Sequence, residues 1–248
     1  MMTLNIIVLF LAAFIAGLSS FVFPKIRGKM YKLILVFAGA YLFSITIIHI
    51  LPELYHHAGD PTIIGLYVLG GFFLQQVLEY FSTGAEHGHI HVNSAKHTHS
   101  RTSVFPIIIA LSLHAFLEGT LLAHPSTIHD DHDAQALLLG IVLHKAPAAF
   151  ALMTIVLCYL NSKKWALVLL TLFSLASPAG VLAGHYIVNA DNVSANFFTI
   201  LFGVVSGNFL HISTTIVFET NKDHDFNARK LGTAMLGALV AVLAEVWM

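Results

Sequence analysis

The segment WALVLLTLFSLASPAGVLAGHYIVNA, from Trp165 to Ala190, contains no aspartate, glutamate, lysine or arginine. About 20 mostly apolar residues are enough for an α-helix to cross the hydrocarbon core of a bilayer. A soluble domain rarely contains such a stretch, because about a quarter of its residues are charged. This segment therefore predicts a transmembrane helix, and it sets the fold class for the rest of the chain.

The same pattern recurs along the 248 residues, of which 57% are hydrophobic and 10% charged. The mean hydropathy is +0.80, a balance that a lipid environment tolerates. We expect an all-α polytopic membrane protein, with one transporter domain over residues 1–248. Its eight expected transmembrane helices cover residues 4–23, 33–51, 62–82, 103–123, 136–160, 165–189, 194–218 and 231–248.

The basic residues alternate between the connecting segments. Eleven of the twelve Lys and Arg residues fall near the first, third, fifth and seventh connections, and none falls in the others. They are Lys25, Arg27, Lys29, Lys32, Lys96, Arg101, Lys163, Lys164, Lys222, Arg229 and Lys230. By the positive-inside rule the odd connections are cytoplasmic, so both termini are expected on the extracytoplasmic side.

Four polar residues interrupt the fourth and fifth expected helices near the centre of the bilayer. His114 and Glu118 are four residues apart in one helix, and His144 is followed by Lys145 in the next. Residues at positions i and i+4 share a helix face. Ionisable groups at this depth are costly and usually mark a transport path or a binding site. The alternative is a set of hydrogen bonds that hold helices together.

Two imidazoles and a carboxylate favour Zn²⁺ and related first-row ions over Ca²⁺ or Mg²⁺, which prefer oxygen ligands. Cys158 is the single cysteine, which excludes a thiolate-rich site. Three protein ligands leave a fourth position for water or another side chain. Pro147, three residues after His144, frees the carbonyl of Leu143 from its helical hydrogen bond and predicts a kink there.

The sequences His114-Ala-Phe-Leu-Glu118-Gly119 and His144-Lys145-Ala-Pro147 resemble motifs of the ZIP family of divalent-metal transporters, in the branch with His-Lys in the fifth helix. Three further segments resemble family patterns at the expected helices: Gly71-Phe-Phe-Leu, Ser177-Pro178-Ala-Gly180 and Gly207-Asn-Phe-Leu210. The resemblance implies eight helices and metal uptake towards the cytoplasm by an elevator-like motion. It also implies that His114, Glu118 and His144 are the primary metal ligands.

Three positions differ from what many members of that family have. Ala115 stands where an asparagine is common, Lys145 where an acidic residue is common, and Ala148 where a glutamate or histidine would lie. The resemblance then implies one metal ion instead of two. A further hypothesis is that Lys145 takes the place of the second ion and pairs with Glu118.

Other polar residues are candidates for a path to and from this site. His49 and Glu53, again at i and i+4, lie at the outer end of the second helix and are predicted to receive ions, although an interfacial cap explains them equally well. Glu79, His211 and Glu219 lie in the third and seventh helices and are candidates for ion release. The cytoplasmic loop 84–102 is expected to bind metal weakly through His87, His89, His91, His97 and His99.

The function expected from these features is transport of divalent metal ions, with Zn²⁺ uptake into the cytoplasm favoured and Fe²⁺, Mn²⁺ and Cd²⁺ as other substrates. The metal is cargo, so no catalytic cofactor is expected. A metal-dependent intramembrane hydrolase or hydroxylase, or export of the same metals, is the alternative. The expected partners are metal ions, lipid and a second copy in a homodimer, without nucleic acid, and the expected location is a bacterial inner membrane.

Overall fold

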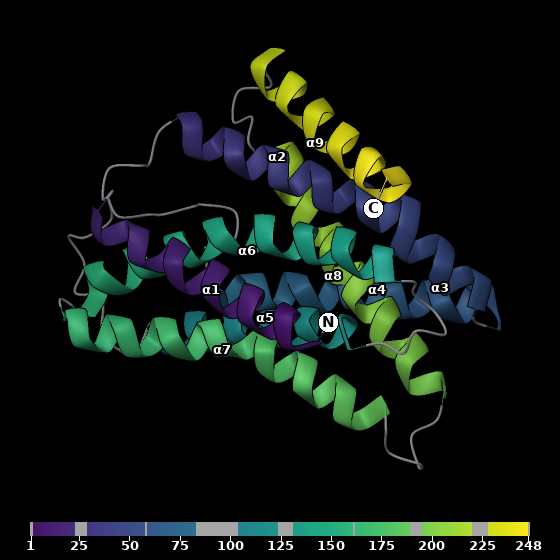
Figure 1. Ribbon diagram of the computed structural model, residues 1–248, viewed down its shortest axis with the longest axis horizontal. Coiled ribbons are helices and arrows are strands. Elements are labelled where there is room, and N and C mark those ends of the chain that lie inside the picture. The colour runs from purple at the N-terminus through teal and green to yellow at the C-terminus, as the bar shows by residue number, and fades with distance from the viewer. Residues whose placement is uncertain are drawn as a thin grey trace.

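The computed structural model describes residues 2–22, 29–57, 59–82, 104–123, 131–160, 162–188, 195–219 and 228–247 (Figure 1). Within these ranges the chain forms nine α-helices and one π-helical segment, and no strand. The helices are α1 (Met2–Val22), α2 (Lys29–Ile45), α3 (Leu51–His57), α4 (Pro61–Ser82), α5 (Val104–Leu121), α6 (Asp131–Leu160), α7 (Lys163–Val188), α8 (Ala195–Glu219) and α9 (Ala228–Trp247). The π-helix η1 (Thr46–Ile50) joins α2 directly to α3.

The expected all-α architecture with eight helices is confirmed, because α2, η1 and α3 form one continuous helix over Lys29–His57. By length and composition, seven of the described helices could cross a membrane; α9 is the exception. The helix α9 includes Arg229, Lys230 and Glu245, and it packs lengthwise against α2 (Figure 1). Because seven helices are long and apolar enough to cross a bilayer, the chain is an integral membrane protein.

The helices pack in two groups. The first group contains α1, α5, α6 and α7, and the second contains α2–α3, α4, α8 and α9. The main contacts between the groups are those of α2 with α6 and of α4 with α5. Two tyrosines of α2 bond backbone carbonyls of α6 across this boundary: Tyr31 donates to Pro147 at 3.1 Å and Tyr41 donates to Ala136 at 2.9 Å.

Glycines allow the closest helix contacts within each group. A Cβ atom on Gly119 of α5 would overlap the carbonyl oxygen of Ser177 in α7, and one on Gly180 would overlap that of Phe116. A small residue at such a crossing lets two backbones approach closely. The contact matters for the site described below, because Gly119 follows Glu118 directly in the sequence.

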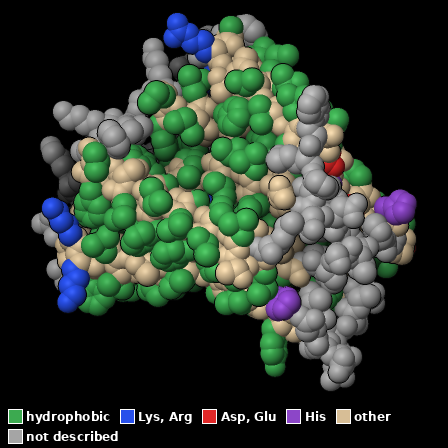
Figure 2. Space-filling view, in the orientation of Figure 1, with side chains coloured by type: hydrophobic (Ala, Val, Ile, Leu, Met, Phe, Trp, Pro, Cys, Tyr) green, Lys and Arg blue, Asp and Glu red, His purple; other side chains and the backbone are tan. Residues whose placement is uncertain are grey.

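The surface is largely apolar. Figure 2 shows hydrophobic side chains over most of the visible face, with lysine and arginine at its left and upper margins and histidine towards the right. The helix α6 lies deepest, with 72% of its apolar span buried, whereas only 22% of the span of α4 is buried. A site built on α5 and α6 therefore lies inside the protein, and α4 presents most of its surface outward.

Candidate metal centre

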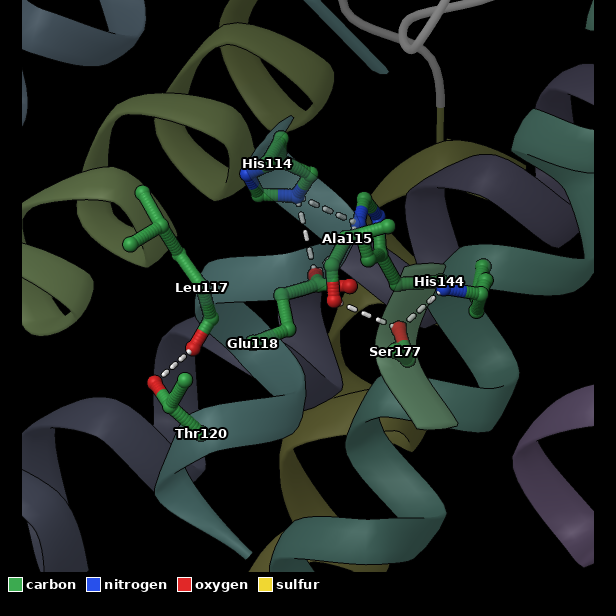
Figure 3. Close-up of polar contacts among 8 residues, drawn as sticks. His114, Ala115, Leu117, Glu118, Thr120, His144 and Ser177 are labelled. Carbon is green, nitrogen blue, oxygen red and sulfur yellow. Dashed lines mark hydrogen bonds and ion pairs between the residues drawn. The ribbon is translucent and has the colours of Figure 1, made fainter. Parts of the chain in front are cut away.

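The side chains of His114, Glu118 and His144 meet between α5 and α6 (Figure 3). His114 and Glu118 lie one turn apart on α5, and His144 reaches them from the middle of α6. All three are buried, with exposed fractions of 3%, 1% and 2%. The sequence-based expectation that these residues lie at one depth agrees with this arrangement.

The three ligand atoms form a small triangle. The Oε1 atom of Glu118 lies 2.9 Å from Nε2 of His114 and 3.0 Å from Nε2 of His144. The two Nε2 atoms are 3.3 Å apart. Two ligand atoms of a tetrahedral zinc ion lie about 3.3 Å apart when the bonds are about 2.0–2.1 Å long. All three separations are within about half an ångström of that value.

The contacts within the triangle are close but are not well-formed hydrogen bonds to the carboxylate. Neither oxygen of Glu118 accepts a hydrogen bond from the described residues, although two imidazole nitrogens are near one of them. Buried carboxylates in native proteins normally have hydrogen-bond or ionic partners. The arrangement therefore suits two imidazoles and a carboxylate that share a bound cation better than three side chains that hydrogen-bond to one another.

Lys145 points to a different partner from the one hypothesised. Its ammonium donates to Oγ of Ser177 in α7, and Ser177 in turn donates to the carbonyl of Ala115 at 2.6 Å. The ammonium also lies 5.0 Å from the centre of the Phe173 ring. The hydrogen-bond acceptor of Lys145 is thus a neutral hydroxyl, and the electrostatic pairing of Lys145 with Glu118 stays a prediction. The chain from Lys145 through Ser177 to Ala115 links α6, α7 and α5 beside the triangle.

The two candidate access residues are together, with a third that the sequence had not singled out. Nε2 of His49 lies 3.4 Å from Oε2 of Glu53, and its Nδ1 lies 2.9 Å from Oε1 of Glu245 in α9. Glu245 was not singled out from the sequence, where it lies near the end of the last expected helix. The rule that identified Glu118, a carboxylate within an apolar span, could have identified it.

Two of the three release candidates form a pair. Oε2 of Glu79 in α4 lies 2.6 Å from Nε2 of His211 in α8, and the ring of Phe72 packs edge-on against His211. The side chain of Glu219 and the loop histidines His87, His89, His91, His97 and His99 lie outside the described residues. Only Glu79 and His211 are therefore placed relative to the rest of the protein.

Ser177 is the other residue whose role the sequence did not reveal. It appeared only within the family-like segment Ser177-Pro178-Ala-Gly180, not as a hydrogen-bond acceptor. A lysine buried to 1% exposure needs an acceptor, so a search for hydroxyls at the same depth could have proposed it.

The chain is similar to a known family and to named relatives. The family described as ZIP Zinc transporter matches residues 84–245. "Protein zntD" of Dictyostelium discoideum is 32% identical over 152 residues, which is 58% of this chain and 22% of that protein. "Zinc transporter ZIP1" of Danio rerio is 25% identical over 126 residues, which is 50% of this chain and 40% of the relative.

The aligned part is thus less than half the length of these relatives. The family match covers more than half of this chain, and it includes all of α5–α8 and hence every residue of the triangle. The chain belongs to the ZIP zinc transporter family.

Proposed function

We propose that this protein carries divalent metal ions across a membrane, with Zn²⁺ as the main substrate, through a site formed by His114, Glu118 and His144. The observation that carries the proposal is the triangle of two imidazole nitrogens and one carboxylate oxygen, with sides of 2.9, 3.0 and 3.3 Å. The triangle is buried, so its ligands have little access to bulk water. Family membership and relatives named as zinc transporters support a transporter over an enzyme.

The donor set decides the class of ion. Two nitrogens and one carboxylate suit Zn²⁺, and also Fe²⁺, Mn²⁺ and Cd²⁺, whereas Ca²⁺ takes six to eight oxygen ligands. The Nδ1 atoms of His114 and His144 are buried and have no hydrogen-bond partner among the described residues. Imidazoles that hold a resident metal tightly usually donate the second N–H to a carboxylate or carbonyl. A less supported ligand set favours release, as a cargo site requires.

The proposal includes one ion at this site and not two. Beside His114 and His144 stand Ala115 and Lys145, and one helical turn after His144 stands Ala148, none of which offers an anionic ligand. The cation of Lys145 is already buried next to the triangle. A second divalent ion placed there would meet a like charge in a medium of low dielectric constant. The branch with His-Lys in the fifth helix is part of this proposal.

The direction is proposed to be uptake into the cytoplasm. The proposal rests on the alternation of basic residues, which predicts that the amino and carboxyl ends are extracytoplasmic. His49 and Glu53 would then receive ions, and Glu79, His211, Glu219 and the loop histidines would take them up inside. Export of the same metals is the alternative, and metal accumulation in cells that produce the protein distinguishes the two directions.

The proposed setting is a cell membrane, specifically a bacterial inner membrane, with a homodimer as the assembly. The relatives named above come from a slime mould and a fish, so they support membrane insertion and not this location. Fractionation of the native cells tests the location, and the mass of the protein in nanodiscs tests the assembly.

The central test is uptake of Zn²⁺ into proteoliposomes that contain the purified chain. We expect His114→Ala and Glu118→Gln to reduce the rate at least about tenfold, because each removes a ligand of the proposed transport site. His185→Ala, an exposed histidine of α7, is the matched control and should retain the wild-type rate. Uptake that survives both site variants would overturn the proposal, as would equal uptake of Ca²⁺ and Zn²⁺.

A further inference from the structure

We propose that His49 and Glu53 form a second site for a divalent cation, in which Glu245 is the positioning residue for the imidazole. The site lies between the continuous helix α2–η1–α3 and α9, and it shares no residue with the triangle. It is a binding site in its own right, so its existence does not depend on the proposed transport.

The two contacts of the His49 ring have different lengths. The Nδ1 atom is 2.9 Å from Oε1 of Glu245, a normal hydrogen-bond distance. The Nε2 atom is 3.4 Å from Oε2 of Glu53, which exceeds the usual range of about 2.7–3.2 Å for such bonds. It matches the separation of about 3.3 Å between two ligand atoms on one zinc ion. One nitrogen is thus held by a carboxylate, and the other is spaced for a metal.

The hydrogen bond to Glu245 prepares the ring for metal binding. A neutral imidazole that donates from Nδ1 has its lone pair on Nε2. Metal-binding histidines almost always donate their other N–H to a carboxylate, carbonyl or water, which fixes the tautomer and makes the ligand more basic. Glu245 supplies this partner from a different helix. The histidines of the triangle have no such support within the described residues, so the imidazole of His49 is the better prepared ligand.

The charges around His49 also favour a divalent ion. His49 is 7% exposed, and the side chains of Glu53 and Glu245 are 10% and 25% exposed. The Oε2 atom of Glu245 is buried and accepts no hydrogen bond from the described part of the chain. A divalent cation at Nε2 of His49 would be attracted by both of these carboxylates.

The backbone around His49 is unusual in a way that serves this arrangement. His49 lies within the π-helix η1, where the N–H of Leu51 bonds the carbonyl of Thr46. The next residue, Pro52, has no N–H to give to a preceding turn. Single π-turns inside α-helices occur often at functional sites. Here the wider turn carries a histidine that contacts both its own helix and α9.

Anomalous diffraction from crystals of the full chain in Zn²⁺ tests the site directly. We expect a peak at the zinc edge within about 2.0–2.2 Å of His49 Nε2 and Glu53. A peak at the triangle without one at His49, at a Zn²⁺ concentration well above that which saturates the triangle, overturns the inference. A peak at His49 alone supports the inference and counts against the proposed central site. Peaks at neither site count against both.

Substitutions test the role of Glu245. We expect Glu245→Ala to weaken Zn²⁺ at His49 by about 10–100-fold, as loss of such supporting carboxylates does elsewhere. Glu245→Gln keeps a hydrogen-bond acceptor and should restore part of the occupancy, with the triangle occupied equally in all variants. Asp60→Asn is the charge-matched control, because Asp60 is exposed and bonds the backbone N–H of Thr62. Equal zinc occupancy at His49 in Glu245→Ala and Asp60→Asn would overturn the positioning role.

Discussion

The hydroxyl of Ser177 donates to the carbonyl of Ala115 at 2.6 Å and accepts from the ammonium of Lys145. One oxygen thereby joins three helices of the first group next to the candidate metal centre. Since Lys145 is 1% exposed, this oxygen is a large part of what replaces water around a buried cation.

Ser177→Ala should lower the free energy of unfolding by about 1–3 kcal/mol, because it leaves a buried donor without its acceptor. The midpoint of thermal unfolding in detergent measures the loss. Ser174→Ala is the matched control: Ser174 is equally buried on the same helix, but its hydroxyl has no hydrogen-bond partner among the described residues. Equal unfolding midpoints for the two variants would contradict the role of Ser177.

Replacing Lys145 with glutamate should change the number of metal ions at the centre from one to two. The substitution exchanges a repelling cation for a ligand. The number of bound metal ions is measured by mass spectrometry for the wild type and Lys145→Glu, and again for each of them with Glu118→Ala added. The loss of ions caused by Glu118→Ala is then compared between the two backgrounds, because any metal bound to the loop is the same in both. If Glu118→Ala removes one ion from both the wild type and Lys145→Glu, Lys145 does not exclude a second ion. Unchanged affinity and transport in Lys145→Ala would argue the same way.

Gly119→Ala should separate α5 from α7, since the added methyl group would overlap the backbone of Ser177. Overpacking of this kind costs about 1–3 kcal/mol, and here it also displaces Glu118. We expect a lower unfolding midpoint and weaker Zn²⁺ binding. Gly232→Ala in α9 is the control, because a Cβ there meets nothing within 4 Å. The idea fails if both alanine variants bind Zn²⁺ as the wild type does.

The pair formed by Glu79 and His211 offers a test of ion release. Glu79→Gln and His211→Gln should lower the maximal rate of Zn²⁺ uptake and leave zinc occupancy of the central triangle unchanged. The double variant should be no slower than either single one, because the two side chains are 2.6 Å apart and act as a unit. If the variants instead lose stability in proportion to rate, the pair serves packing between α4 and α8.

Much of this protein could be predicted from its sequence, because lipid restricts what can lie in a span. Long charge-free segments predict helices, and the few ionisable residues inside them stand out, as His114 and Glu118 did. The i, i+4 spacing placed those two on one face of α5. Their convergence with His144 could be predicted by counting residues from the ends of both helices, which places all three residues at the same depth.

The remainder depends on contacts that no local pattern encodes. The acceptor of Lys145 is on α7, and the partner of His49 is on α9, nearly 200 residues away along the chain, so their identity follows from helix packing. The π-turn at His49 was also unforeseen, since its sequence reads as ordinary apolar helix. For both Lys145 and His49, the sequence indicates that a buried polar group needs a partner, but it does not identify the partner.

The division of the helices into two groups has a consequence for engineering. The triangle and Lys145 belong to the first group, whereas the His49 cluster and the Glu79–His211 pair belong to the second. Tyr31 and Tyr41 bond backbone carbonyls across the boundary, and every residue type at Pro147 or Ala136 would supply one. The two halves are therefore suited to exchange between homologues as modules, one with the proposed transport site and one with the proposed access and release residues.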